Sequence, residues 1–301
     1  MSLTQAKLWV VATPLGNPGD MSPRAVKTLE SAGLILAEDT RRAGLLCQRL
    51  GIDHGRMVSS FDHNENSRIP LVLETLAQGR DVALISDAGT PLIADPGYVI
   101  VRACRQAGFP VSPVPGPCAP IAALMTCGLP STPFTFLGFL PRKPNDIRAT
   151  LTPFADVQTT LVFFERKNRL AVSLGVAREV LGGRLYCVAR ELTKTHEECI
   201  TGSLDNDQDL ERLATMDIRG ECTVVIGPAD VSRTRSDESR VRDILREELA
   251  QGGKPRAVAK RVAARVSGWS AKDVYAMQQV VHGRTTSDAG SHGPDRSDHG
   301  L

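Results

Sequence analysis

The sequence predicts an α/β protein of two domains, with a parallel N-terminal sheet, a mixed second sheet and a small C-terminal helical extension. The chain has 301 residues, of which 42% are hydrophobic, enough for two cores of ordinary size. In the first 118 residues, short apolar runs alternate with helical segments through short connections, which favours a parallel sheet with helices on both faces. Several later runs follow one another without a helix between them, which indicates a mixed sheet.

The first half offers five short apolar strands, each followed by a polar loop and a helix. The strands are expected at residues 7–12, 34–37, 57–61, 82–85 and 110–114. The first helix should begin at Ser22 and Pro23, because serine caps a helix and proline fits its first position. Further helices are expected up to about Leu50 and at 70–78, 96–106 and 118–128.

The second half continues with strands at 134–139, 160–164, 185–189, 197–201 and 222–226, and with helices at about 145–154, 168–181 and 206–214. After residue 230 the composition becomes small, charged and helical. Gly252 and Gly253 end one helix, Pro255 begins the next, and Ser270 with Asp273 resembles a capping box. We therefore expect domains at 1–118 and 119–230, a helical extension at 231–283 resembling a helix-turn-helix, and a disordered tail at 284–301.

Charge and cysteine content exclude several classes of protein. Lysine and arginine number 36 against 34 acidic residues, so any RNA contact must come from a local basic patch. The seven cysteines include no Cys-x-x-Cys pair and no histidine at zinc spacing, which indicates reduced thiols, a cytoplasmic protein and no metal site. No apolar run approaches the roughly 18 residues of a membrane helix, and no export signal is recognisable.

Three loops at the carboxyl ends of predicted strands are rich in small residues and proline. The central one follows residues 82–85, where Asp87 is succeeded by Ala88, Gly89 and Pro91. In open α/β sheets, ligands collect outside the carboxyl ends of the strands. The glycine-rich loops typical of dinucleotide and triphosphate sites are missing. Loops of this kind suit a ligand that is bound largely through backbone groups, with an occasional carboxylate.

Six motifs follow one another along the chain: Val11-Ala-Thr-Pro-Leu-Gly-Asn17, Glu38-Asp-Thr-Arg41, Ser86-Asp-Ala-Gly-Thr-Pro91, Pro115-Gly-Pro-Cys-Ala119, Gly138-Phe-Leu-Pro-Arg-Lys143 and Ala189-Arg-Glu-Leu-Thr-Lys194. In this order they resemble the motifs of the ribosomal RNA small subunit methyltransferase I family, one of the tetrapyrrole-methylase-like S-adenosylmethionine (AdoMet) enzymes. The resemblance implies a two-domain tetrapyrrole-methylase-like fold with AdoMet in the cleft between the domains, and a homodimer. It also implies methylation of the ribose 2′-hydroxyl of a cytidine in the decoding region of 16S rRNA, naked or within the 30S subunit, with no DNA partner.

Transferred residue by residue, the resemblance implies AdoMet contacts from all three loops and from the second domain. The chain departs from the family at Arg166-Lys167-Asn168, where relatives usually carry Ser-Pro-His or something close, and at Cys118, which replaces a usual serine. The first departure lies near the expected cleft. The implied AdoMet contacts are Pro14, Gly16, Ser86, Asp87, Ala88, Gly89, Ala119, Glu191 and Leu192.

A ribose hydroxyl is a poor nucleophile while protonated, so a base is expected to assist the transfer by about 10²- to 10⁴-fold. The candidates are Asp39, Glu165 and Glu191. Each of these carboxylates could instead serve only in an ion pair that joins a strand end to a helix.

The basic residues expected at RNA fall into two groups. Arg41 and Arg42 follow the second predicted strand. Between Lys254 and Lys272 there are six basic residues and no acidic one, which suits either an RNA contact or a solvated helix face. From this segment we expect RNA contacts from Lys254, Lys260, Arg261 and Arg265.

Two other functions compete with rRNA methylation. A methyltransferase of a tetrapyrrole or cobalamin precursor would share the fold. However, enzymes of that kind tend to carry Gly-Asp-Pro where this chain has the loop from Ser86 to Pro91, and a small-molecule substrate would not require basic C-terminal helices. A non-catalytic RNA-binding protein would use those helices alone. Methylation of uroporphyrinogen would support the first alternative, and failure to bind AdoMet the second.

Overall fold

The structure is a computed structural model that describes residues 5–216, 220–229, 236–266 and 268–285. Contacts divide the chain into two compact units, Met1–Pro228 and Ala229–Leu301. The first unit contains two five-stranded sheets, one parallel and one mixed, which confirms the predicted fold class.

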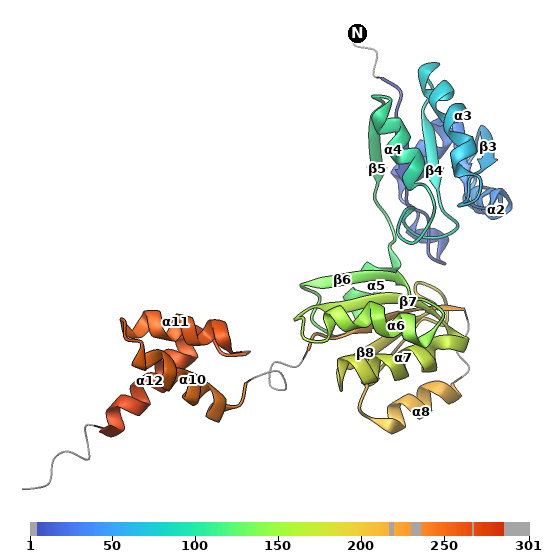
Figure 1. Cartoon of the computed structure of the whole chain (residues 1–301). Coiled ribbons are helices and arrows are strands. Elements are labelled where there is room, and N and C mark those ends of the chain that lie inside the picture. Colours follow the sequence, from blue (N-terminus) through green and yellow to red (C-terminus); the bar gives the residue numbers. More distant parts are fainter. Residues whose placement is uncertain (1–4, 217–219, 230–235, 267, 286–301) are drawn as a thin grey trace, which may run out of the picture. The chain divides into compact units, whose positions relative to one another are not determined.

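The parallel sheet has the strand order β3-β2-β4-β1-β5 and is covered by helices on both faces (Figure 1). Helices α1 and α2 pack on one face, while α3 and α4 pack on the other. The central strand β4 is buried along its whole length, as its unbroken apolar run predicts. The strands are β1 (Leu8–Val11), β2 (Leu34–Ala37), β3 (Arg56–Ser59), β4 (Val82–Ile85) and β5 (Val111–Val114), and the helices are α1 (Pro23–Ser31), α2 (Thr40–Leu50), α3 (Glu65–Ala77) and α4 (Tyr98–Gln106).

Local sequence signals account for most helix limits in this sheet. Ser22 caps α1 through the amide of Ala25, and Pro23 takes the first helical position, as predicted. The prediction that a helix begins at Pro70 is wrong, because α3 begins at Glu65 and contains Pro70. The proline removes the amide that would bind the carbonyl of Asn66, but Asn66 is exposed, so water can satisfy that carbonyl instead.

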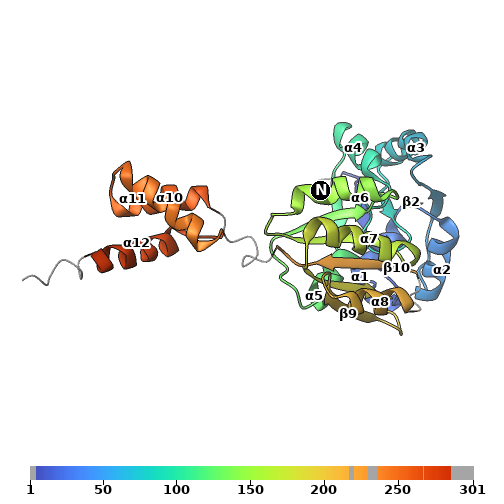
Figure 2. The ribbon, with the colours of Figure 1, turned by 60° about the horizontal axis from the view of Figure 1, so that its bottom comes forward.

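The mixed sheet has the order β6-β7-β10-β8-β9, in which only β6 and β7 run parallel. Helices α6, α7 and α8 cover one face and α5 covers the other (Figure 2). The elements are α5 (Ala119–Thr126), β6 (Phe134–Phe139), α6 (Pro144–Leu151), β7 (Thr160–Arg166), α7 (Lys167–Leu181), β8 (Leu185–Arg190), β9 (Glu198–Ser203), α8 (Asp207–Thr215) and β10 (Glu221–Ile226), with short 3-10 helices at Pro18–Asp20 and Thr152–Phe154.

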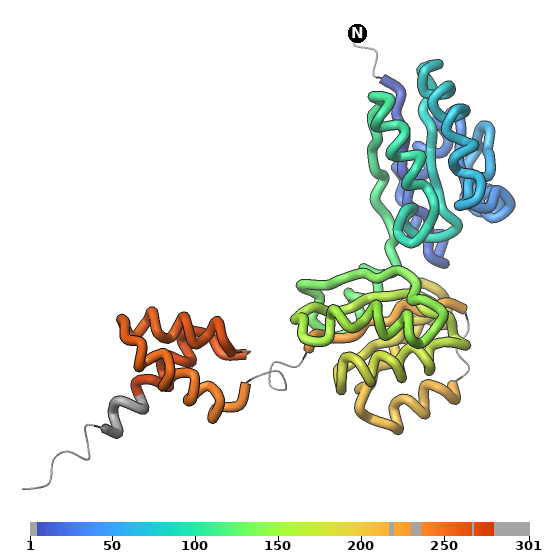
Figure 3. The backbone as a smooth tube through the Cα atoms, viewed as in Figure 1, coloured from blue at the N-terminus to red at the C-terminus, as the bar shows by residue number. Residues whose placement is uncertain are grey.

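The chain passes from the first sheet to the second through the segment between β5 and α5 (Figure 3). We propose that the limit between the first domain and the second lies after residue 118, because this position falls in that segment.

The described residues of the second unit form the helices α10 (Glu238–Ala250), α11 (Pro255–Arg265) and α12 (Ala271–Thr285), which share a small apolar core. Ser270 and Asp273 form the reciprocal hydrogen bonds of the predicted capping box. Of the predicted tail, residues 284 and 285 end α12, and residues 286–301 lie outside the described residues. In the described part of the chain, no helix is both long and apolar enough to cross a bilayer.

Candidate functional site

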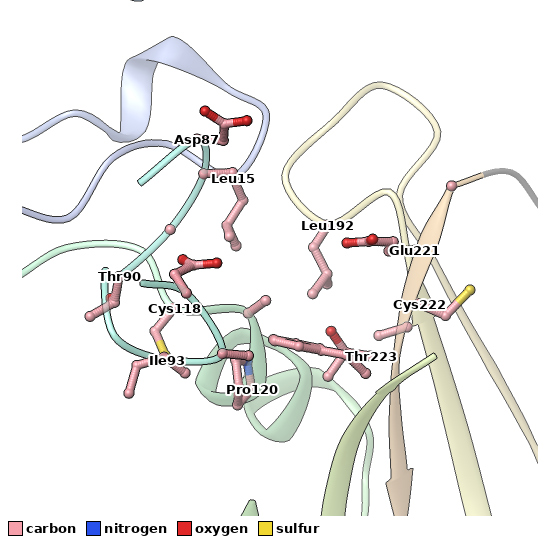
Figure 4. A pocket seen from close by; sticks show the side chains of 18 of the residues that line it. Leu15, Asp87, Thr90, Ile93, Cys118, Pro120, Leu192, Glu221, Cys222 and Thr223 are labelled. Atoms are coloured by element: carbon pink, nitrogen blue, oxygen red, sulfur yellow. The ribbon is translucent and has the colours of Figure 1, made fainter. Parts of the chain in front are cut away.

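A cavity of about 640 Å³ lies where loops of the parallel sheet meet the second sheet. From the parallel sheet it is lined by Leu15 after β1, by Glu38 after β2 and by the loop after β4. Figure 4 shows Leu15 and Asp87 opposite Leu192 and Glu221, which come from the ends of β8 and β10. The cavity therefore lies at the carboxyl ends of parallel strands, where open α/β sheets bind their ligands.

Asp87 connects the loops that follow β2 and β4. Its Oδ1 accepts a hydrogen bond of 3.0 Å from the backbone amide of Asp39, and its Oδ2 lies 3.0 Å from a guanidinium nitrogen of Arg42. In return, the amide of Asp87 donates to Glu38. Because each bond joins residues more than forty positions apart, the carboxylate fixes the shape of this side of the cavity.

The loops around the cavity contain unusual backbone. Among the described residues, Leu92, Ala94, Glu191 and Thr193 are the non-glycine residues with positive φ, and all four lie in the loops after β4 and β8. Holding the backbone of a non-glycine residue at positive φ costs about 1–3 kcal/mol of folding free energy, and the conformation persists only where the surrounding structure enforces it. Such strain is typical of ligand-binding loops.

Two segments from the two sheets are in contact beside the cavity. The hydroxyl of Thr193 accepts a hydrogen bond of 3.2 Å from the amide of Asn17. The side chain of Lys194 crosses Gly16, where an added Cβ would lie only 2.3 Å from the lysine Cγ, and its ammonium group lies 3.0 Å from Glu191. Gly16 thus leaves room for Lys194 to reach Glu191.

The cavity is acidic. Among the described residues, five carboxylate side chains line it, against three cationic ones. Burial raises the pKa of Asp95 from 3.8 to about 7, and the nearby charges of Glu38, Asp87 and Glu221 act in the same direction, although a hydrogen bond with Ser86 opposes them. Burial likewise raises the pKa of Glu38. The carboxylates are Glu38, Asp87, Asp95, Glu191 and Glu221, and the cations are Arg42, Arg166 and Lys194.

Most of the expected AdoMet contacts lie at this cavity. Pro14, Gly16 and Ser86 do not line it. Leu15, which lies between the first two in the chain, does, and the Ser86 hydroxyl lies 3.4 Å from the carbonyl of Ala88. The expected residues that do line it are Asp87, Ala88, Gly89, Ala119, Glu191 and Leu192.

The three candidate bases lie in different surroundings. Glu191 lines the cavity. Asp39 does not line the cavity. Its carboxylate caps α2 by accepting from the amide of Arg41, and it also pairs with the guanidinium of Arg41, which holds the pKa of Asp39 below its usual range. Glu165 is fully buried and accepts from the hydroxyl of Ser173, the amide of Arg166 and the guanidinium of Arg169. The structure thus brings only Glu191 of the three to the cavity.

Sequence reasoning missed Asp95, Glu221 and Arg166 as lining residues. Asp95 lies only eight positions after Asp87 in the same proline-rich loop, so the extent of that loop was an available signal. No local signal pointed to Glu221, because it begins a strand whose place beside β7 and β8 depends on antiparallel pairing over long distances. Arg166 stood out only as part of a departure from the family pattern.

The predicted RNA contacts also separate into two kinds. Arg42 lines the cavity and pairs with Asp87, whereas the guanidinium of Arg41 binds Asp39.

In the second unit, Arg261 and Arg265 lie 2.7 and 2.8 Å from the nearly buried carboxylate of Glu248. Their guanidiniums hold the pKa of Glu248 below its usual value. Lys254 and Lys260 are exposed and have no ion-pair partner within the described ranges. These two lysines are therefore better placed for RNA than the two arginines.

Comparison with known proteins gives a family profile and close relatives. The profile described as "Tetrapyrrole (Corrin/Porphyrin) Methylases" matches residues 7–206. Proteins called "Ribosomal RNA small subunit methyltransferase I" are similar over nearly the whole chain. The one from Xylella fastidiosa is 41% identical, covering 90% of this chain and 98% of its own. The one from Mycobacterium tuberculosis is 42% identical, covering 91% and 94%.

Solved structures share the fold at low sequence identity. The methyltransferase CobJ matches with a TM-score of 0.58 and 20% identity, covering 77% of this chain and 96% of its own. Uroporphyrin-III C-methyl transferase from Thermus thermophilus, complexed with S-adenyl homocysteine, matches with a TM-score of 0.53 and 19% identity, covering 74% and 97%.

Proposed function

Because the chain belongs to the ribosomal RNA small subunit methyltransferase I family of the tetrapyrrole methylases, we propose that it methylates 16S rRNA with AdoMet as the methyl donor. The acceptor is the ribose 2′-hydroxyl of a cytidine in the decoding region. The observation that carries this proposal is the cavity, whose described lining has five carboxylates against three cations. A surplus of negative charge suits a donor that carries a positive sulfonium.

The residues present fit AdoMet. Ala88, Gly89 and Ala119 keep part of the wall free of large side chains, and Gly89 adopts a φ of +79°, which favours glycine. Leu15 and Leu192 offer apolar surface on opposite sides for an adenine ring. Asp87 is rigidly held by Asp39 and Arg42 and would bind polar groups of the donor. When bound, AdoMet supplies an electrophilic methyl group.

We infer that a cavity carboxylate takes the proton of the ribose hydroxyl, which would prepare the ribose oxygen to accept the methyl group that AdoMet would supply. Glu191 is engaged by Lys194 at 3.0 Å, so one of its carboxylate oxygens already has a partner. Asp95 lines the same cavity, has no cationic partner among the described residues and has a pKa raised to about 7. Asp95 is therefore the better placed base, and Glu191 is the alternative. Asp39 and Glu165 do not line the cavity.

The test is transfer of tritiated methyl groups from AdoMet to 30S subunits and to naked 16S rRNA, followed by mass spectrometry of the nucleosides. The wild type should produce 2′-O-methylcytidine. Asp87→Ala should lower the rate at limiting AdoMet by about 10- to 100-fold, because a charged hydrogen-bond acceptor at the cavity is lost. Asp53→Ala, an exposed carboxylate outside the cavity, should leave the rate unchanged.

Two results would overturn the proposal. Label on base atoms would exclude ribose chemistry, and methylation of uroporphyrinogen III with inert rRNA would support the tetrapyrrole alternative.

We also propose a homodimer located in the cytoplasm. On α5, Ile121 and Met125 lie four residues apart and are 44% and 80% exposed, so one helical face offers apolar surface to a second copy. Light scattering should give twice the mass of one chain, and the mass of a single chain would contradict the dimer.

A further inference from the structure

A second cavity of about 500 Å³ adjoins the acidic one and has the opposite charge. It lies where β6 ends and α7 begins, and both cavities are lined by Phe139 and Arg166. Three arginines line the second cavity, Arg142, Arg166 and Arg169, and no acidic residue does among the described residues. The two cavities therefore offer a negative site beside a positive one.

One of the three arginines has a structural role. The guanidinium of Arg169 lies 3.2 Å from the buried Glu165 and donates to the backbone carbonyls of Leu140 and Pro141. It thus holds the segment after β6 against α7, and little of its hydrogen-bonding capacity remains for a ligand.

The other two arginines remain available. The Arg166 side chain is 63% exposed, and its nearest acidic partner among the described residues, Glu221, is 3.8 Å away. Arg142 is exposed and has no ion-pair partner in the part of the chain that the structure describes. Two guanidiniums at one cavity suit the phosphates of a polyanion.

An aromatic ring stands between the two cavities. Phe139 is 41% exposed, and its ring centroid lies 5.2 Å from that of Phe164, which packs at 5.1 Å against Phe136. The β6–β7 register shifts between Phe136 and Phe139, and Gly138 adopts a φ of +68° there. Phe136 and Phe139 lie three positions apart, so in a regular strand their side chains would point to opposite faces. Because of the bulge, both contact the ring of Phe164, and Phe139 is directed to the cavities.

We propose that this second cavity binds single-stranded RNA next to the nucleotide that is methylated. Arg142 and Arg166 hold phosphates, and a neighbouring base stacks on Phe139. Cationic side chains beside an exposed aromatic ring are the usual elements of single-strand recognition. The inference rests on the proposed rRNA methylation and adds where the acceptor strand is held. It also assigns a role to Arg166 within the segment that departs from the family.

The test measures the KM for 30S subunits as a function of salt, together with AdoMet affinity by calorimetry. Because Arg142 lines only the second cavity, Arg142→Ala should raise the KM about three- to tenfold and leave the AdoMet affinity within twofold. The slope of log KM against log salt concentration should fall by about one, the value for one lost phosphate contact. Arg142→Lys should restore part of the affinity. Arg24→Ala, an exposed arginine outside both cavities, is the matched control and should behave as wild type.

Phe139 is tested by substitutions that keep its packing against Phe164. Phe139→Leu should raise the KM about fivefold or more, because an aliphatic side chain cannot stack on a base, whereas Phe139→Tyr should keep the wild-type KM. The melting temperature of each variant verifies that the fold is retained.

Failure of this inference differs from failure of the proposed function. If the wild type methylates rRNA while Arg142→Ala keeps its KM and salt dependence, the second cavity does not bind RNA and the inference is overturned. An inert wild type on rRNA overturns the proposed function instead, and with it the inference.

Discussion

Asp95 shows how a single residue couples the cavity to pH. Its pKa in the folded protein is about 7 against an ordinary 3.8, because burial and three neighbouring carboxylates disfavour its charge. Below about pH 4 the group is protonated in both the folded and the unfolded chain. As pH rises to about 7, the unfolded chain loses the proton first, so the free energy of unfolding of the free protein falls.

We therefore predict that Asp95→Asn stabilises the free protein at pH 8 and has little effect at pH 4. The full shift would correspond to about 4 kcal/mol, but Asp95 is only partly buried, so about 1–2 kcal/mol is expected after solvent screening. Thermal unfolding at pH 4, 6 and 8 measures the effect. The matched control is Asp53→Asn, which replaces an exposed aspartate outside the cavity. A pH-independent difference for Asp95→Asn would exclude the raised pKa.

At the scale of elements, Glu165 joins β7 to α7. Its carboxylate is fully buried, and Arg169 and Ser173, both on α7, donate to it. Removing one partner of a buried ion pair leaves the other charge without compensation.

We predict that Glu165→Ala lowers the free energy of unfolding by about 3–5 kcal/mol, and that Glu165→Gln is less damaging. Thermal and chemical unfolding measure this. In protein that remains folded, the rate of methyl transfer should change little with either variant. A large loss of rate without a change in stability would instead return Glu165 to the role of base.

On the helices of the second unit, some basic side chains are held in ion pairs and others are exposed to solvent. Arg261 and Arg265 link α11 to Glu248 of α10, while Lys260 on the same helix is exposed. We predict that Arg261→Ala increases amide hydrogen exchange in residues 238–265 of the full chain, because an ion pair between α11 and α10 is lost. Lys260→Ala should leave hydrogen exchange unchanged, but it should weaken RNA binding and reduce the salt dependence of that binding. If Lys260→Ala leaves RNA binding unchanged, this helix face is only solvated.

At the scale of the whole molecule, the acidic cavity depends on contact between two sheets. The segment after β1 reaches the segment after β8 through Asn17 and Thr193 and through Lys194, which crosses Gly16. Gly16→Ala would place a methyl group in the path of a flexible side chain, so Lys194 can move away and the fold should survive.

We predict that Gly16→Ala weakens AdoMet binding several-fold, because a displaced Lys194 no longer holds Glu191, one of the expected AdoMet contacts, in place. The melting temperature should stay within about 2 °C of wild type. Calorimetry and thermal unfolding measure the two effects. Lys194→Ala should reproduce the loss of affinity. If the affinity is unchanged in both variants, this contact between the sheets does not support the cavity.

The sequence by itself determined the fold class, nearly all strands and helices, and the position of Asp87 at the carboxyl end of a buried strand. These features depend on the period of apolar residues and on caps such as Ser22, which involve residues a few positions apart. The start of α3 was missed because Pro70 is tolerated only where its neighbours leave a carbonyl exposed to water.

Only the tertiary structure decided which charges are available. Glu165 is enclosed by α7, and Arg261 and Arg265 are held by Glu248 on another helix. Glu221 reaches the cavity from the start of β10, the central strand of its sheet. Next to the bulge at Gly138, Phe139 lines both an acidic cavity and a basic one. The physical reason is that burial and ion pairing depend on residues that are distant in the chain, so no local pattern records them.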